Sequence, residues 1–197
     1  MAFSFSTRAA RTALASAALL VLGTVAAPAA NAYNPDIDGD GIPNTWEMKG
    51  YDANGDGKID VNYPAMGANP LKKDLFVEMD YMPDLLASED ELDRITEIYA
   101  KLPIRNPNGT TGINIHLDAG SARSAKYNLG GGNEVAHEQL DSGLQRWREI
   151  RTKNMDPNRE SVFHYMIWGD SYGDRGSSGQ GWVGGRGFIV TVGPRFW

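Results

Sequence analysis

The sequence predicts an α/β fold with a mixed, largely parallel twisted sheet and crossover helices, preceded by acidic loops. Apolar residues alternate along residues 73–82 and again along residues 112–118, as in half-buried strands. Between them, residues 88–102 carry apolar side chains at helical spacing. A strand, a helix and a second strand of these lengths favour a right-handed crossover and a parallel pair. An acidic, glycine-rich segment, residues 36–62, precedes the first strand.

The N-terminal segment, residues 1–32, has the organisation of a secretory signal peptide. It combines a charged region with Arg8 and Arg11, a small apolar region at residues 12–27, and a cleavage pattern at Ala30-Asn31-Ala32. The apolar region is too short for a spanning helix, which disfavours an uncleaved anchor. We therefore predict a secreted, extracellular protein without a membrane segment after cleavage.

Composition narrows the possible functions. The chain has 197 residues, enough for one domain with a substantial core. Its net charge is −6 at pH 7 and it has no basic patch, so nothing indicates a nucleic-acid partner. Most of this net negative charge lies between residues 34 and 62, where seven acidic side chains face only two lysines, which suggests a bound cation. The chain has no cysteine, so a bound metal could supply the stabilisation that disulfides give many secreted proteins.

The first acidic loop, residues 36–47, has the full spacing of an EF-hand-type calcium loop. Side-chain oxygens occur at loop positions 1, 3, 5, 9 and 12, and a backbone carbonyl is available at position 7. Gly41 at position 6 allows the sharp turn that a side chain would hinder. The predicted calcium ligands are Asp36, Asp38, Asp40, the Ile42 carbonyl, Asn44 and Glu47. The alternative, a surface turn rich in Asp and Gly, is disfavoured by the complete match.

A second loop follows at once and matches the pattern except at its last position. Its predicted ligands are Asp52, Asn54, Asp56, the Lys58 carbonyl and Asp60. Position 12 is Tyr63, so this loop is weaker, is completed by an oxygen from elsewhere, or is an acidic turn without metal. The two loops lie too close together for two helix–loop–helix units. We expect tandem EF-hand-like loops over residues 33–70 that stabilise the fold.

Beyond the loops, strands and helices should alternate. The expected strands are residues 73–82, 112–118, 161–168 and 188–192, the last buried on both faces. The expected helices are residues 43–49, 88–102 and 133–153, the last with a break possible at Gly143. Ser88 and Glu91 form the pattern of a capping box. Glycine-rich residues 130–132 and 169–187 are interpreted as a hinge and a long mobile loop.

Several segments together resemble a group of secreted bacterial zinc metallopeptidases of the metzincin type. The segments are Asp36–Glu47, Gly50–Asp52, Pro64–Ala68, Lys73–Met82, Gly112–Gly120 and Gly187–Gly193, each short but in family-like order and spacing. The resemblance implies an α/β enzyme domain over residues 71–197, with a twisted mixed sheet, after calcium loops. It also implies a zinc-binding helix with the motif H-E-x-x-H-x-x-G-x-x-H beyond the strand at residues 188–192.

That zinc motif is absent from the sequence. The only histidines are His116, His137 and His164, and none matches the zinc ligands of the family. Zinc peptidases need two histidines one helical turn apart, a third ligand and a glutamate that activates water. We therefore assign no catalytic residue, expect no peptidase activity from this chain as given, and interpret it as truncated before the zinc-binding helix. Zinc would be a cofactor only if such a helix exists downstream.

One further pattern on a predicted helix resembles a metal motif. His137, Glu138 and Asp141 form an HExxD string whose side chains would lie on or beside one helical face. The string lacks a third ligand and does not lie where the family has its zinc site. An exposed, polar helix start is the favoured alternative.

The expected function is that of a secreted calcium-binding protein related to zinc metallopeptidases. One alternative is a non-enzymatic, calcium-dependent binding module for a protein or peptide partner. Another is an active hydrolase that uses Glu78, Asp80 and His116, which lie on the polar faces of two strands expected to be adjacent. A polar sheet face without catalysis competes with that last alternative.

Overall fold

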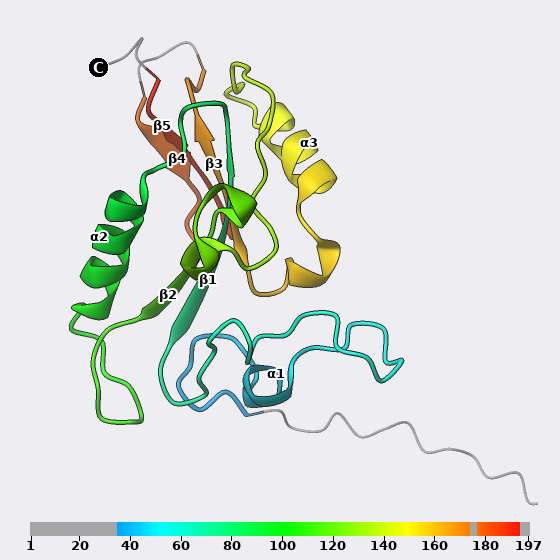
Figure 1. Ribbon diagram of the computed structural model, residues 1–197, viewed down its shortest axis with the longest axis vertical. Helices are drawn as coiled ribbons and strands as arrows, with labels where there is room; N and C mark the ends of the chain where they lie inside the picture. Colours follow the sequence, from blue (N-terminus) through cyan, green and yellow to red (C-terminus); the bar gives the residue numbers. More distant parts are fainter. Residues whose placement is uncertain (1–34, 174–176, 194–197) are drawn as a thin grey trace, which may run out of the picture. The chain divides into compact units, whose positions relative to one another are not determined.

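The computed structural model describes residues 35–173 and 177–193, in which five strands form one sheet in the order β2–β1–β3–β5–β4 (Figure 1). The strands are β1 (Asp74–Tyr81), β2 (Asn114–Asp118), β3 (His164–Gly169), β4 (Gly179–Gly181) and β5 (Gly187–Thr191). β1 is parallel to both β2 and β3, β3 is parallel to β5, and β4 is antiparallel to β5. The prediction of an α/β fold with a largely parallel sheet is confirmed. The predicted signal peptide lies outside the described residues.

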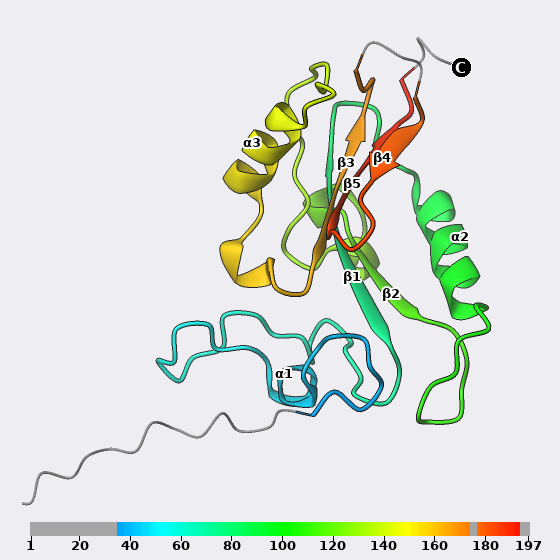
Figure 2. The ribbon, with the colours of Figure 1, turned by 180° about the vertical axis from the view of Figure 1, so that it is seen from behind.

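Helices cover both faces of this sheet (Figures 1 and 2). The α-helices are α1 (Asn44–Lys49), α2 (Glu89–Ala100) and α3 (Gln145–Asn154), and short 3-10 helices span Gly120–Ala122, Ala125–Tyr127 and Pro157–Arg159. α2 packs Leu92 against the β1 and β2 face that includes Val77 and Leu117. α3 packs Trp147 and Ile150 into the cluster on the opposite face. For α2, the helical spacing of apolar residues in the sequence predicts a row of apolar side chains on one side, and this row faces the sheet.

The acidic loops share a hydrophobic core with the sheet. Ile42, Val61 and Tyr63 are buried in one cluster with Phe76 of β1 and Phe163. Loop residues and sheet residues thus belong to one packed unit, and the position of the loops is fixed by aromatic and aliphatic contacts.

The prediction of a helix over residues 133–153 is wrong for its first half. Only α3 is helical, and residues 133–144 run as an irregular chain that pairs with other elements: Val135 N–H donates to the Tyr81 carbonyl, and Leu140 N–H to the Ser171 carbonyl. These tertiary hydrogen bonds replace the helical ones, and Leu144, with φ of 63°, precedes the first helical residue.

The glycine-rich segments are also more ordered than predicted. Residues 179–181 form β4, which pairs with β5 and covers its edge. β5 buries alternate residues, so only one of its faces is fully buried. Residues 130–132 are closely packed: a Cβ on Gly131 would lie 2.5 Å from Arg159 Nη1, and one on Gly132 would lie 2.4 Å from the Ala119 carbonyl carbon. Such contacts contradict the interpretation of this segment as a hinge.

Within the described residues, no helix is long and apolar enough to cross a membrane.

We predict that Ser88→Ala lowers the free energy of unfolding by about 1 kcal/mol, because the Ser88 side chain and Glu91 form a complete capping box at the start of α2. Urea unfolding at constant calcium measures this difference. Ser124→Ala is the matched control, since Ser124 precedes a 3-10 helix without a side-chain cap. Equal stability losses in the two variants would contradict the capping role.

Candidate metal centre

The first acidic loop is held in its turn by hydrogen bonds from its own backbone to its side chains. Asp36 accepts from the N–H groups of Gly39 and Gly41 at 2.7 and 2.9 Å. Asp38 accepts from Asp40 N–H, and Asp40 accepts from Ile42 N–H. Gly39 and Gly41 have φ of 74° and 92°, conformations that other residues rarely adopt. These local hydrogen bonds help to gather the early carboxylates of the loop.

Glu47 completes the loop from the following helix. Gly50, with φ of 87°, ends α1 after one and a half turns, as the sequence predicts. The Glu47 side chain is only 2 % exposed, and neither carboxylate oxygen has a hydrogen-bond partner among the described residues. Buried carboxylates almost always have such partners. Glu47 therefore has no compensating hydrogen bond from the described residues.

Two overlapping groups of three carboxylates form around this position. Asp36, Asp38 and Asp40 have ligand atoms within 4.8 Å of one another, and so do Asp40, Glu47 and Asp74. Asp40 belongs to both groups, so the five side chains are continuous. All atoms offered are carboxylate oxygens, the ligand type that hard divalent cations prefer.

Asp74 is the site residue that sequence reasoning missed. It is the first residue of β1, and its N–H donates to Asp40 Oδ2 at 2.7 Å. The EF-hand spacing includes only residues within one loop, so it cannot indicate a carboxylate that arrives from the sheet. Lys73 was missed for the same reason, and its Nζ donates to the Asp38 carbonyl.

Burial and mutual repulsion make the ionised state of these carboxyl groups costly. Burial, with repulsion from Asp40 and Asp38, raises the pKa of Glu47 to about 8. Burial and Asp40 likewise raise the pKa of Asp38 to about 6, and burial raises the pKa of Asp40. A cation at this position would oppose all three shifts.

The second loop repeats the hydrogen-bond pattern of the first at loop positions 1, 3, 5 and 9. Asp52 accepts from the N–H groups of Gly55 and Gly57, as Asp36 does from Gly39 and Gly41. Asn54 accepts from Asp56 N–H and Asp56 accepts from Lys58 N–H, as Asp38 and Asp40 do in the first loop. Asp60 accepts from Ala53 N–H, as Asn44 does from Ile37 N–H. Its side chains are largely solvent-exposed, however, and Asp52, Asp56 and Asp60 form no group of three close carboxylates among the described residues.

The two loops differ at loop position 12. Tyr63 occupies it in the second loop, is fully buried, and contacts Phe76 edge-on with ring centroids 5.5 Å apart. The second loop therefore uses its last position as a hydrophobic anchor, where the first loop presents the Glu47 carboxylate.

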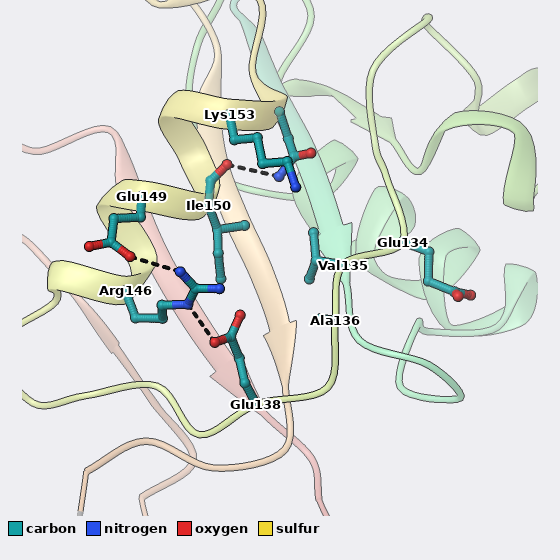
Figure 3. Close-up of a pocket in the computed structure, with 9 residues that line it drawn as sticks. Glu134, Val135, Ala136, Glu138, Arg146, Glu149, Ile150 and Lys153 are labelled. Carbon is teal, nitrogen blue, oxygen red and sulfur yellow. Dashed lines mark hydrogen bonds and ion pairs between the residues drawn. The ribbon is translucent and has the colours of Figure 1, made fainter.

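The HExxD residues do not share a helical face, because residues 137–141 are not helical. Glu138 pairs instead with Arg146 of α3, which also pairs with Glu149, beside a small cleft (Figure 3). Asp141 accepts from the N–H groups of Gln145 and Arg146 at the start of α3. The structure thus gives two of these residues roles in ion pairing and helix capping.

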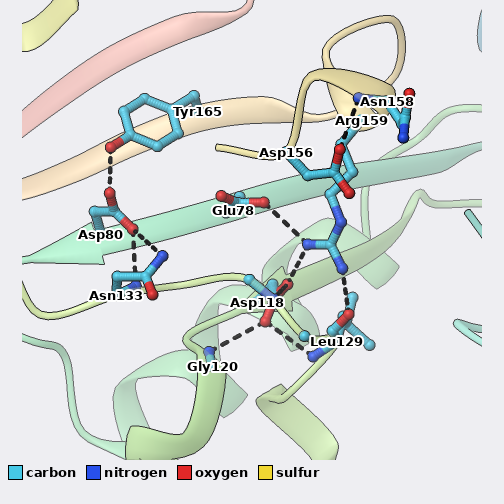
Figure 4. Close-up of polar contacts among 12 residues, drawn as sticks. Glu78, Asp80, Asp118, Gly120, Leu129, Asn133, Asp156, Asn158, Arg159 and Tyr165 are labelled. Carbon is cyan, nitrogen blue, oxygen red and sulfur yellow. Dashed lines mark hydrogen bonds and ion pairs between the residues drawn. The ribbon is translucent and has the colours of Figure 1, made fainter. Parts of the chain in front are cut away.

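Glu78 lies in a buried ion-pair network on the face of β1 and β2 opposite α2 (Figure 4). Arg159 Nη1 is 2.9 Å from Glu78 Oε2 and 2.8 Å from Asp118 Oδ2, and all three side chains are buried. Asp118 also accepts from the N–H groups of Leu129 and Gly131. Arg159 is far from Glu78 in sequence, so no spacing rule predicts the pair.

Asp80 and His116 are engaged separately. Asp80 accepts from the Tyr165 hydroxyl and from Asn133 N–H, and is fully buried (Figure 4). His116 Nε2 lies 2.6 Å from Asp74 Oδ1, and the ring stacks on Phe76 at 4.2 Å. The structure therefore does not gather Glu78, Asp80 and His116 into one open site, which leaves the hydrolase alternative without support.

Comparisons with models of protein families, with curated proteins and with solved structures find no match to this chain.

We predict that Arg159→Met lowers the free energy of unfolding by about 3–5 kcal/mol, because it leaves Glu78 and Asp118 buried without a counter-charge. Denaturant titration with a shared m-value measures the loss. Arg146→Met is the matched control: it removes two solvent-exposed ion pairs, for which about 1 kcal/mol or less is expected. A similarly small effect in both variants would contradict the structural role of Arg159.

Proposed function

We propose that this protein binds Ca²⁺ through the Asp36–Glu47 loop together with Asp74, and that the ion stabilises the α/β fold. The observation that carries the proposal is Glu47. Its two carboxylate oxygens are buried without a described partner and belong to a group of close carboxylates with Asp40 and Asp74. A divalent cation supplies the missing counter-charge.

The donor set favours calcium over other common cations. The two clusters of three carboxylates contain no cysteine or histidine, which are the soft or borderline ligands that zinc prefers in proteins. Five neighbouring carboxylates and an irregular loop suit the six to eight oxygens of Ca²⁺ better than the strict octahedron of Mg²⁺. The loop spacing, with oxygen ligands at positions 1, 3, 5, 9 and 12, supports the same ion. Extracellular sites of this kind bind with Kd of about 10⁻⁴–10⁻³ M.

The ion would act as a cross-link between the N-terminal loop and the sheet. Asp36, Asp38, Asp40 and Glu47 come from the loop and α1, and Asp74 begins β1. A ligand that binds only the folded state stabilises it by about 2.7 kcal/mol at a hundred times Kd. In a chain without cysteine this contribution takes the place of a covalent constraint.

The second loop is proposed as a weaker calcium site or a metal-free turn. Its backbone has the same hydrogen-bond pattern, which supports binding, but it lacks a carboxylate at position 12 and is exposed to water. Exposed carboxylates in water gain less from a cation than buried ones.

The wider assignment is a secreted relative of metzincin-type zinc metallopeptidases without peptidase activity in this chain. The parallel β1–β2 and β1–β3 pairs and the preceding acidic loops support it. We assign no zinc site, because the three histidines match no zinc-peptidase spacing.

We predict that calcium raises the melting temperature of the wild-type protein and that Glu47→Gln removes most of this increase. The substitution keeps the shape of the side chain and removes the charge that needs the ion. Calorimetric scans with calcium and with chelator measure both effects, and titration calorimetry gives the stoichiometry. Asp56→Asn, in the second loop, should retain the increase. A calcium response unchanged in Glu47→Gln would contradict the proposed site.

We also predict that calcium binding releases close to one proton at pH 7. With its pKa raised to about 8, Glu47 holds a proton in the metal-free folded protein at pH 7 and loses it to coordinate the ion. The unfolded chain is ionised there, so metal-free stability falls as pH rises from about 5 to 8. Binding enthalpies in PIPES, HEPES and Tris buffers measure proton release. Glu47→Gln is the control, and binding without proton release would contradict the assignment of Glu47.

A further inference from the structure

A basic, aromatic cleft lies between α3 and the turn that precedes β5. It has a volume of about 280 Å³ and is lined by Leu144, Trp147, Arg148, Arg151, Trp182, Gly185, Arg186 and Gly187. None of the lining residues is acidic, although the chain as a whole has a net charge of −6. The cleft is therefore a local exception to the charge of the protein.

Two of its arginines have no ionic partner within residues 35–173 and 177–193. Arg148 and Arg186 are exposed, and each makes one long hydrogen bond of 3.4 Å, to the carbonyls of Gly143 and Glu160. Only Arg151 forms an ion pair, 3.3 Å from the Glu160 carboxylate. Of the three guanidinium groups, one is paired with an acidic side chain among the described residues, and two remain available for an anion.

Two tryptophans form the apolar part of the cleft. Their ring centroids are 5.1 Å apart, and Trp147 is only 8 % exposed. Trp147 also packs edge-on against Tyr165 of β3, which fixes its position. A Cβ on Gly187 would lie 2.4 Å from the Trp147 ring, so the first residue of β5 must be glycine for the ring to stay there.

Two buried donors in this region lack acceptors. Trp147 Nε1 and Arg151 Nε have no hydrogen-bond partner among the described residues. Buried N–H groups without acceptors are costly, so an acceptor that reached either group would be favoured.

We propose that this cleft binds an acidic peptide segment in which a carboxylate adjoins an aromatic side chain. Arginine guanidinium groups recognise carboxylates through paired hydrogen bonds, and tryptophan and arginine are among the residues that dominate peptide and protein recognition. Charge complementarity favours an acidic partner, and the indole rings favour one that also presents a flat apolar group. The proposal is independent of the calcium site.

The test is an NMR titration of the calcium-loaded full chain with unlabelled capped peptides. The probe GEFG should shift the indole N–H signals of Trp147 and Trp182, assigned with Trp147→Phe and Trp182→Ala. GQFG, which differs only in charge, and GEAG, which lacks the ring, should each bind at least about fivefold more weakly. The paired substitution Arg148→Gln with Arg186→Gln should weaken GEFG binding at least about tenfold, since each removes a charged hydrogen-bond donor.

Arg94→Gln is the matched control, because Arg94 is an exposed arginine of α2 outside the cleft. Its affinity for GEFG should equal that of the wild type. The proposal is overturned if GQFG binds as well as GEFG, if inorganic phosphate competes at the same concentration as the peptide, or if raising the salt concentration leaves wild-type binding unchanged. The salt series uses the wild-type protein, so it tests the proposed charge-dependent peptide binding even if the paired variant does not fold.

Discussion

Each buried carboxylate of this fold needs a hydrogen-bond donor or a positive charge that offsets the cost of its burial. That partner is a protein side chain for some of these carboxylates and is not found among the described residues for Glu47. The acidic residues of β1 have protein partners: Asp74 has His116 and Asn114, Glu78 has Arg159, and Asp80 has Tyr165. Glu47 is buried to the same degree, yet has no described partner. An isolated buried carboxylate costs several kcal/mol, and the proposed cation beside Glu47, Asp40 and Asp74 would offset that cost.

An aromatic row connects this position to the sheet. Trp46, which precedes Glu47 in α1, stacks with Tyr63 at 6.4 Å, Tyr63 meets Phe76 at 5.5 Å, and Phe76 stacks on His116 at 4.2 Å. The row runs from α1 through the end of the second loop to β1 and β2. Any movement of α1 would therefore disturb packed rings in the core, since close-packed interiors transmit such displacements. The second loop contributes through Tyr63, whether or not it binds metal.

Local rules in the sequence predicted the parts of the fold that depend on local interactions. The capping box at Ser88, the end of α1 at Gly50 and the strands β1 and β2 follow from residue type and periodicity, and the structure has all of them. The prediction of a helix before Gly143 was wrong because this segment donates backbone hydrogen bonds to Tyr81 and Ser171, which are distant in sequence. These tertiary hydrogen bonds outweigh the helix propensity of the segment.

The candidate site divides in the same way. The clustering of Asp36, Asp38 and Asp40 could be predicted because the three residues belong to one short loop with a regular spacing. Asp74 could not, because its approach to Asp40 depends on where the sheet begins relative to the loop. Arg159 was missed for a related reason, since only the tertiary fold brings it to Glu78 and Asp118.

The proposed calcium site and the arginine–tryptophan cleft are distinct, but they depend on the same core. Trp147, the floor of the cleft, lies in one hydrophobic cluster with Ile42 and Tyr63 of the acidic loops. A ligand changes the affinity at another site only to the extent that it shifts the population of the competent state. If the metal-free protein remains folded, calcium should leave peptide affinity unchanged. If the metal-free protein is partly unfolded, calcium should increase the apparent affinity by the factor by which it increases the folded fraction. Calcium-dependent binding would then be a consequence of fold stability, with no conformational switch in the cleft.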